Sequence, residues 1–340
     1  MLADTQLNKL ESHFPQLKFE RNYPLSLITY FKVGGPARSL VKVDSLKDLV
    51  ELIRHCHQSQ IRFVLLGGAS NVVVADEGID GLVIVTTNDR VLLTSKENEN
   101  GLLDNEQSSF QYKQEKSTQN IVRAECGART AMLVNKSIEF GLTGLEPFMG
   151  VPGKVGGAIF NNSHFQDELI GDFIARVEVL NKKGERVWLN QAECQFDYDH
   201  SRFQTSGEVI LQADFLLVHG EKEESRRRAR ELMNYRAQTQ PLGVPSSGCI
   251  FKNVKNTPQL QTLFPQFADK QYVSAGFLID QAGLKGLREG DIEVSSKHAS
   301  FMINVGTGSA TDIQKLVEKV KLKVEKQFGV TLQEEIFWIK

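Results

Sequence analysis

The sequence contains no long hydrophobic run and carries little net charge, and each absence excludes a class of protein. No stretch approaches the roughly 18 consecutive apolar residues that a membrane-spanning helix needs. The formal net charge is −2 at pH 7, so the composition offers no basic field for nucleic acid or an anionic membrane. The opening residues, MLADTQLNKLESHF, lack the basic and apolar segments of a secretory signal, and we therefore expect a cytoplasmic protein.

Paired cysteines are also missing. Cys56, Cys126, Cys194 and Cys249 are scattered, without a C-x-x-C pair or a His/Cys cluster at zinc spacing, so we predict no metal site. Dispersed thiols in a reducing compartment are usually free and buried. At this point Cys249, in the stretch SSGCIFKN, is open to four interpretations: core filler, metal ligand, half of a disulfide, or participant in chemistry.

The length and composition predict a soluble globular protein of several domains. The chain has 340 residues, of which 41% are apolar and 24% are charged, and one hydrophobic core rarely serves so long a chain. We expect two lobes at residues 1–80 and 81–222 and a third domain at residues 223–340. The polar residues of about 97–120 are interpreted as a surface insertion in the second lobe.

Local patterns predict several individual elements. Apolar residues at helical spacing follow Ser45, a residue type that caps helix N-termini. The stretch SATDIQKLVEKVKLKVEKQFG predicts a helix that Ser309 caps and Gly329 ends. The run EKEESRRRARELMNY predicts a charged helix at the boundary into the third domain, and TLQEEIFWI predicts a final strand.

Glycine-rich loops are the most distinctive feature of the first two lobes. LLGGASNVVV and PFMGVPGKVGGA leave backbone N–H groups unhindered, as an anion cradle requires, although each alone is also typical of an ordinary turn. Neither loop is G-x-G-x-x-G or a P-loop motif. A pair of such loops, one in each lobe, suits a long diphosphate-bearing cofactor between the lobes, and TYFKVGGPA adds a third glycine pair.

These loops, followed in order by SSGCIFKN, SAGFLIDQAGLKG, VSSKHASFMINVG and LQEEIFWI, resemble the motifs of the UDP-N-acetylenolpyruvoylglucosamine reductase family. The resemblance runs from about residue 25 to the C-terminus. It implies an α+β fold, in which a two-lobed FAD-binding module of the vanillyl-alcohol oxidase type precedes a C-terminal α+β substrate domain. It also implies FAD and NADPH as cofactors, and reduction of UDP-N-acetylglucosamine enolpyruvate to UDP-N-acetylmuramate in peptidoglycan precursor synthesis. We expect a monomer, because no exposed heptad array is visible.

The resemblance also implies binding residues. Those for FAD lie in the three glycine-rich stretches: Thr29, Gly34, Gly35, Leu66, Gly67, Gly68, Ala69, Ser70, Asn71, Gly150, Pro152, Gly153, Val155, Gly156, Gly157 and Ala158. Those for the substrate are Tyr198, Arg236, Asn253 and His298, of which Arg236 is a candidate diphosphate contact. A solvated arginine and a surface histidine are the alternatives for Arg236 and His298.

The implied catalytic groups include two departures from the family pattern. Cys249 stands where the family's G-S-x-F-x-N pattern has the serine that acts as the general acid. A thiol that is mostly protonated at neutral pH is a competent general acid. Glu335 matches the terminal glutamate, with Glu334 as the alternative register. Where the family has an arginine for the substrate carboxylate, this chain has Asp199. We expect Arg202, paired with Asp199, to supply the missing guanidinium, and a surface ion pair is the alternative.

Two other functions stay open at this point. A sugar or lactone oxidase of the same superfamily would share the FAD-binding lobes but not Cys249 and Glu335. A flavin- or nucleotide-binding regulator without catalysis is favoured only by the missing arginine. The segment Asn161–Gln166 also departs from the family pattern, since Phe165 lacks the usual tyrosine hydroxyl and His164 is new.

Overall fold

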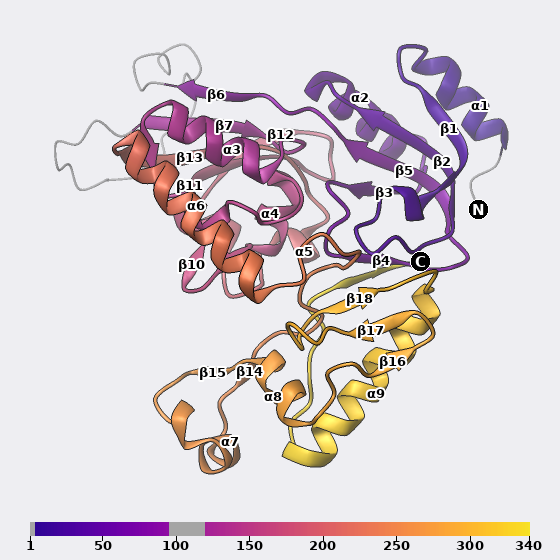
Figure 1. The fold of residues 1–340 in the computed structure, drawn as a ribbon. Helices are drawn as coiled ribbons and strands as arrows, with labels where there is room; N and C mark the ends of the chain where they lie inside the picture. Colours follow the sequence, from indigo (N-terminus) through magenta and orange to yellow (C-terminus); the bar gives the residue numbers. More distant parts are fainter. Residues whose placement is uncertain (1–3, 95–119) are drawn as a thin grey trace.

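The computed structural model describes residues 4–94 and 120–340. Figure 1 shows three parts: two lobes beside each other, and a C-terminal part below them. The insertion expected at about 97–120 lies outside the described residues, apart from Asn120, which begins a strand. Among the described residues, no helix is both long and apolar enough to cross a bilayer.

The first lobe is built on a mostly parallel sheet. Its strand order is β1 (Phe19–Pro24), β2 (Pro36–Val43), β5 (Ile79–Thr86) and β3 (Phe63–Leu66). Only β1 runs antiparallel to its neighbour. Parallel neighbours need a crossover, which α2 (Leu46–Gln58) supplies, and α1 (Asp4–His13) packs in the same core. Ser45 caps α2 through the Asp48 N–H at 3.3 Å, so the predicted helix and cap are confirmed.

The second lobe holds an antiparallel sheet. Its strands lie in the order β12 (Arg186–Asn190), β11 (Ile174–Leu180), β13 (Val209–His219), β7 (Asn120–Glu125) and β6 (Val91–Thr94). Its helices are α3 (Thr130–Glu139), α4 (Val155–Asn161), α5 (Phe203–Ser206) and α6 (Lys222–Thr239). Short strands β8 (Leu142–Thr143), β9 (His164–Phe165) and β10 (Glu168–Leu169) complete the lobe.

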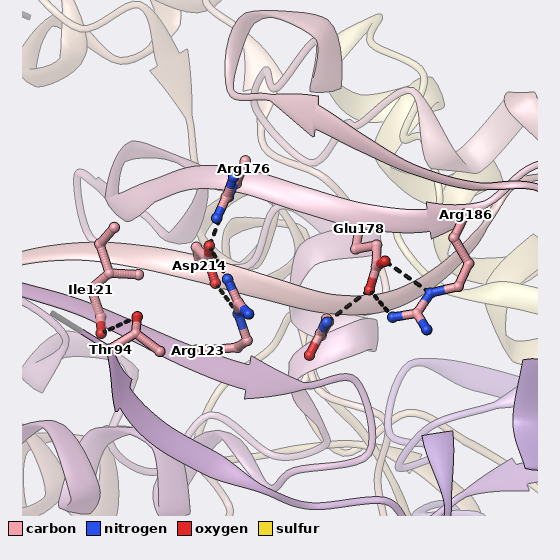
Figure 2. A network of polar contacts seen from close by, with 8 residues as sticks. Thr94, Ile121, Arg123, Arg176, Glu178, Arg186 and Asp214 are labelled. Carbon is pink, nitrogen blue, oxygen red and sulfur yellow. Dashed lines mark hydrogen bonds and ion pairs between the residues drawn. The ribbon is translucent and has the colours of Figure 1, made fainter. Parts of the chain in front are cut away.

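One face of the second sheet carries ion pairs. Figure 2 shows Asp214 between two arginines, Arg123 at 2.6 Å and Arg176 at 2.7 Å. On the same face Glu178 pairs with Arg186 at 2.8 Å. Alternate residues of these strands point to the opposite face and enter the main apolar core. One face of the sheet is therefore apolar and packs against the core, and ion pairs link side chains of neighbouring strands on the other face.

The C-terminal part surrounds one long helix, α9 (Ala310–Phe328). The helix begins with a reciprocal Ser309–Asp312 capping box and ends at Gly329 with φ +67°, so both predicted boundaries are confirmed. Around it lie β14 (Val254–Lys255), α7 (Pro258–Leu263), β15 (Tyr272–Val273), α8 (Ala275–Gln281), β16 (Arg288–Glu289), β17 (Ile292–Val294) and β18 (Met302–Asn304).

The final strand leaves the C-terminal part and joins the first lobe. β19 covers only Phe337–Ile339 and pairs in parallel with β4 (Val72–Val74), directly after the first glycine loop (Figure 1). The predicted strand TLQEEIFWI is therefore confirmed only at its end. Residues 331–336 instead run beside the 249–253 segment, where Phe251 bridges Glu334. This path brings Glu334 and Glu335 to the junction of all three parts.

The structural units extend past the boundaries expected at residues 80 and 222. β5 continues to Thr86 and is an inner strand of the first sheet. α6 packs on α3 and β8 of the second lobe. The charged run was therefore correctly predicted as a helix, but its contacts place it in the second lobe.

Asp76 links the first lobe to the start of α9. Its carboxylate accepts hydrogen bonds from the backbone N–H groups of Ala310 (2.8 Å) and Thr311 (2.9 Å), and from the Thr311 hydroxyl (2.7 Å). Burial raises the pKa of Asp76, but the bonds from Thr311 and Ala310 outweigh it, and the net pKa is lowered. The carboxylate therefore stabilises the fold when it is ionised.

We expect Asp76→Ala to lower the free energy of unfolding by about 1 kcal/mol at pH 7, because it removes the partners of helix N-terminal donors. A lowered native pKa means that this stabilisation is present above the unfolded pKa of about 4 and is lost as pH falls through the native value. Urea unfolding of both proteins at pH 7 and pH 3 measures the difference. Glu77→Ala, at the exposed neighbouring carboxylate, is the control, and an equal effect of both substitutions would contradict the role of Asp76.

Candidate active site

A pocket of about 440 Å³ lies where the three parts meet. The first lobe contributes Ser70 and Asn71, and the second contributes the stretches around Gly150, His164 and Tyr198. The segment from Arg236 to Asn253, with His298, Phe301 and Glu335, closes the remaining wall. Among the residues that the structure describes, no group of three or more His, Cys, Asp or Glu is arranged to hold a metal.

The two glycine loops touch each other directly beside this pocket. A Cβ on Gly68 would lie 2.6 Å from Gly153 Cα, and one on Gly153 would lie 2.6 Å from Ser70 Oγ. The Ser70 hydroxyl also donates to Pro152 O at 3.1 Å. Only glycine permits this approach. A Cβ on Gly157 would meet no atom within 4 Å, so the joined loops leave open space on one side.

Some of the predicted cofactor residues line the pocket, and others do not. Ser70, Asn71, Gly150 and Pro152 line it. Gly68 and Gly153 form the contact between the loops, and the predicted residues that are not among the described lining residues are Leu66, Gly67, Gly68, Ala69, Gly153, Val155, Gly156, Gly157 and Ala158. The FAD contacts themselves stay predictions.

Gly34 and Gly35, the glycine pair of TYFKVGGPA, have a packing role. A Cβ on Gly34 would lie 2.8 Å from Val74 Cβ, and one on Gly35 would lie 2.2 Å from Asp76 O. The Thr29 hydroxyl is buried and donates to Val33 O at 2.8 Å. None of these three residues is among those that line the described pocket. The close approach to β4 therefore accounts for the glycines, and their contact with FAD stays a prediction.

The site has polar groups that the protein itself leaves unpaired. The backbone N–H groups from Gly68 to Asn71 donate to no acceptor among the described residues. Buried pocket side-chain atoms without a partner are Asn161 Oδ1, Asp199 Oδ2, Arg236 Nε, Ser246 Oγ and His298 Nδ1. Buried polar groups in proteins are normally paired, so this pattern fits a polar ligand, and the unpaired amides at a glycine loop fit a diphosphate.

Cys249 and Glu335 come together from neighbouring extended segments. Ile250 donates from its backbone N–H to Ser300 O at 2.8 Å, and Glu335 donates to Ile250 O at 2.8 Å. Gly248, with φ +81°, makes the turn that places Cys249 at the pocket. Asn71 Nδ2 donates to the Glu335 carbonyl at 3.2 Å, which ties the glutamate to the first glycine loop. Both predicted catalytic groups therefore line one pocket.

The pocket raises the pKa of both groups. Burial raises the pKa of Cys249 to about 12, the charge of Glu335 adds to this rise, and a hydrogen bond with Ser300 opposes it. Burial raises the pKa of Glu335 well above its usual value, and the charge of Asp199 raises it further. A protonated thiol and a protonated carboxyl in one pocket can both donate protons or hydrogen bonds.

The structure distinguishes Glu335 from the alternative Glu334. The Glu334 carboxylate accepts from Lys321 Nζ at 3.0 Å and from the Trp338 indole N–H. Glu334 is not among the described residues that line the pocket, whereas Glu335 is. Ser247, just upstream of Cys249, donates its hydroxyl to Val72 O at 3.3 Å. These contacts favour Glu335 over Glu334, and the catalytic roles of Cys249 and Glu335 stay predictions.

The expected pairing of Arg202 with Asp199 is wrong. The Arg202 guanidinium instead forms two hydrogen bonds with Glu208, at 3.0 and 3.1 Å, and a third with Glu193 O at 3.0 Å. Arg202 is not among the described residues that line the pocket. The turn at Asp199, whose φ is +48°, sends the two side chains in different directions. Arg202 therefore stabilises the second lobe and does not supply the missing guanidinium at this site.

Arg236 is the only arginine or lysine among the described residues that line the pocket. It is 5% exposed, and its guanidinium lies 3.8 Å from the centre of the Phe165 ring. Its hydrogen bonds, to Gln240 Oε1 and Pro147 O, are both long at 3.5 Å. Burial lowers the pKa of Arg236 to about 10, and the charge of Cys249 opposes this. A buried cation without an acidic partner fits an anionic ligand.

The remaining predicted substrate residues also line the pocket. Tyr198 Oη accepts from Asn253 Nδ2 at 3.0 Å, which joins the second lobe to the C-terminal part. Burial raises the pKa of Tyr198, and the charge of Asp199 adds to the rise. His298 lines the same pocket, and burial lowers its pKa. All four predicted substrate residues are therefore brought together.

Three contacts at the site were not predicted from the sequence. His164 Nδ1 lies 3.1 Å from Asp199 Oδ1, Lys252 Nζ donates to Asp199 O at 3.2 Å, and Ser300 meets the Cys249 thiol. His164 is one of the departures from the family pattern, and Lys252 belongs to SSGCIFKN. No spacing in the sequence brings residues 164, 199, 252 and 300 together.

Comparisons with known proteins agree with this arrangement. Residues 240–339 match the family model described as UDP-N-acetylenolpyruvoylglucosamine reductase, C-terminal domain, and residues 37–190 match the FAD binding domain. A UDP-N-acetylenolpyruvoylglucosamine reductase of Caldicellulosiruptor bescii is 35% identical over 95% of this chain and 91% of its own length. One from Streptococcus pneumoniae is 36% identical over 92% of this chain and 91% of its own length.

A solved structure extends the likeness to the fold. The crystal structure of UDP-N-acetylenolpyruvylglucosamine reductase from Thermus caldophilus has a TM-score of 0.69 at 28% identity, covering 95% of this chain and 99% of that one. The expected fold, a two-lobed FAD module of the vanillyl-alcohol oxidase type with a C-terminal α+β domain, is confirmed. By its sequence, its fold and its FAD-binding lobes, the chain belongs to the UDP-N-acetylenolpyruvoylglucosamine reductase family of FAD-dependent oxidoreductases.

Proposed function

We propose that this protein uses NADPH to reduce UDP-N-acetylglucosamine enolpyruvate to UDP-N-acetylmuramate, a step of peptidoglycan precursor synthesis. The observation that carries the proposal is the meeting of Cys249 and Glu335, both with raised pKa values, in a pocket beside the joined glycine loops. The match to the FAD binding domain supports FAD as the cofactor, and NADPH as the reductant is part of the proposal. That the protein works as a cytoplasmic monomer stays a prediction.

The residues around the joined loops fit the flavin. The unpaired N–H groups from Gly68 to Asn71 would hold its diphosphate, and the open space beside Gly157 would admit its chain. When bound, FAD accepts hydride from NADPH and supplies it to the enolpyruvyl C3 of the substrate. The protein's own residues then bind the substrate, supply one proton to C2 and stabilise the charge that develops beside the substrate carboxylate.

Cys249 is the proposed proton donor. Addition of hydride at C3 leaves an electron pair at C2, delocalised into the carboxylate, and the Cys249 S–H bond breaks to protonate C2. The thiolate formed lies within electrostatic reach of the Arg236 cation and then takes a proton from solvent. In this proposal the Glu335 carboxyl, whose pKa is raised, takes part in its protonated form and donates a hydrogen bond toward the developing charge.

Arg236 is the proposed anchor for an anionic group of the substrate. Its guanidinium is buried at the pocket wall and lacks a carboxylate partner, so a diphosphate would pair with it. The Tyr198–Asn253 pair, which also lines the pocket, offers hydroxyl and amide groups to the polar remainder of a nucleotide sugar.

The function is tested by incubating the FAD-loaded protein with NADPH and following absorbance at the nicotinamide wavelength. We expect NADPH oxidation only when UDP-N-acetylglucosamine enolpyruvate is present, with stoichiometric formation of UDP-N-acetylmuramate. Rapid oxygen consumption without that substrate would instead indicate an oxidase. Bound FAD with no turnover under either condition would indicate a regulator.

A further inference from the structure

Asp199 places a fixed negative charge in the pocket. The residue is 5% exposed, and its Oδ2 has no hydrogen-bond partner among the residues that the structure describes. The residue has a left-handed φ of +48°, and its carbonyl accepts from Lys252 at 3.2 Å and Gln204 at 3.1 Å. These contacts on its backbone hold the carboxylate in place.

This charge is opposed by a histidine. His164 Nδ1 lies 3.1 Å from Asp199 Oδ1, and the imidazole packs on the Tyr198 ring with 4.8 Å between centroids. Because a carboxylate only accepts, Nδ1 is the donor, and Nε2 is the nitrogen left for another partner. His164 lines the pocket, and its side chain is 22% exposed. When protonated, the ring donates from both nitrogens and bridges two anions.

The substrate of the proposed function brings two anionic groups into this pocket. Its carboxylate is bonded to C2, the atom that receives the proton, so the carboxylate must lie close to both Cys249 and Glu335. His164 and Asp199 line the same pocket as Cys249 and Glu335, and they lie 3.1 Å apart. The charge of Asp199 raises the pKa of both Cys249 and Glu335, which agrees with a position close to them. We therefore assign the carboxylate to the His164–Asp199 pair and leave Arg236 for the diphosphate.

We propose that His164, oriented by Asp199, binds the substrate carboxylate through Nε2 as an imidazolium. The pair thereby provides the cation that an arginine at position 199 would otherwise provide. In this role Asp199 is a positioning residue, since it acts through His164. The inference rests on the proposed function, because it concerns how the same substrate is held.

Two nucleotide sugars separate the carboxylate from the diphosphate. UDP-N-acetylmuramate carries a carboxylate and UDP-N-acetylglucosamine does not, while both carry the diphosphate. Calorimetric titration of the FAD-loaded protein should show that His164→Gln weakens UDP-N-acetylmuramate binding by about tenfold or more, as the loss of a charge-assisted contact would. Binding of UDP-N-acetylglucosamine should change less than about twofold. Arg236→Gln is the matched variant, and it should weaken binding of both ligands.

A second substitution tests the role of the charge. In the His164→Gln/Asp199→Arg double variant, a guanidinium takes over from the imidazolium, and we expect it to regain most of the lost UDP-N-acetylmuramate affinity. Asp199→Asn alone should weaken binding of that ligand in the same direction as His164→Gln. An unchanged flavin absorbance spectrum in each variant shows that the pocket remains folded.

The outcomes distinguish this inference from the proposed function. Equal weakening of both ligands by His164→Gln, or no weakening of either, overturns the carboxylate role while the function stands. If the His164→Gln/Asp199→Arg variant regains no affinity for UDP-N-acetylmuramate, the result overturns the inference that the imidazolium does the work of a guanidinium. Wild-type protein that binds neither nucleotide sugar overturns the proposed function and this inference with it.

Discussion

Replacement of Cys249 by alanine is expected to slow formation of UDP-N-acetylmuramate by about 10²- to 10⁴-fold, the range typical of a lost general acid. Reduction of bound FAD by NADPH should stay at the wild-type rate, because Cys249 acts only after hydride reaches the substrate. Stopped-flow absorbance separates the two half-reactions. Equal slowing of both would contradict a role confined to proton transfer.

Two matched substitutions identify the thiol as the active group. Cys249→Ser keeps a protonated donor of similar size, so we expect part of the substrate reduction to return. Cys56→Ala removes a buried thiol, 0% exposed in the core of the first lobe, and should leave both half-reactions unchanged. A fully active Cys249→Ala would assign the proton to a different donor, with Glu335 the nearest candidate in the pocket.

The raised pKa of Cys249 adds a consequence for pH dependence. Burial, followed by the charge of Glu335, raises this pKa to about 12, so the proton donor stays intact as pH rises through neutrality. Ionisation of the thiol should therefore not lower the rate of substrate reduction between about pH 7 and pH 9, the range in which an ordinary cysteine begins to ionise. Alkylation by iodoacetamide should be slow in the same range, because the thiolate is the reactive form.

Two alanine substitutions in the glycine loops are expected to have large and different effects. Gly157 lies in α4, and a Cβ there meets no atom within 4 Å. Gly157→Ala should therefore preserve the fold of the apoprotein, or stabilise it by up to about 1 kcal/mol through helix propensity. If FAD occupies that open space, its affinity should fall by about tenfold or more.

Gly68→Ala should damage the fold itself. Its Cβ would lie 2.6 Å from Gly153 Cα, and backbone cannot yield as a flexible side chain does. We expect the apoprotein to lose about 1–3 kcal/mol of unfolding free energy, together with FAD binding, because the two loops must separate. Thermal unfolding of the apoproteins and flavin fluorescence titration measure the two effects. Gly157→Ala with wild-type FAD affinity would place the flavin elsewhere.

Local patterns in the sequence predicted the individual elements well. Ser45, Ser309 and Gly329 each mark a helix boundary because a cap depends on hydrogen bonds within a few residues. The glycine loops were recognisable for a related reason, since missing Cβ atoms can be read directly from the residue type. The ordered motifs also indicated the family and the positions of Cys249 and Glu335.

Contacts between distant segments were harder to predict. The extent of β19 depends on β4, more than 250 residues earlier in the chain, and α6 looks like a domain boundary until its packing on α3 is seen. The third catalytic group was predicted wrongly for the same reason. Arg202 lies three residues from Asp199, but the left-handed turn at Asp199 and the nearby Glu208 direct the guanidinium elsewhere.

The sequence by itself therefore determined the family, the glycine loops that approach each other and the identity of the acidic thiol, because residue type and order carry that information. Only the tertiary structure decided which charges meet around the thiol. It brings His164 to Asp199, gives Arg236 no acidic partner within the described residues 4–94 and 120–340, and pairs Arg202 with Glu208. Electrostatic partners are set by proximity in space, and chain separation says little about that proximity.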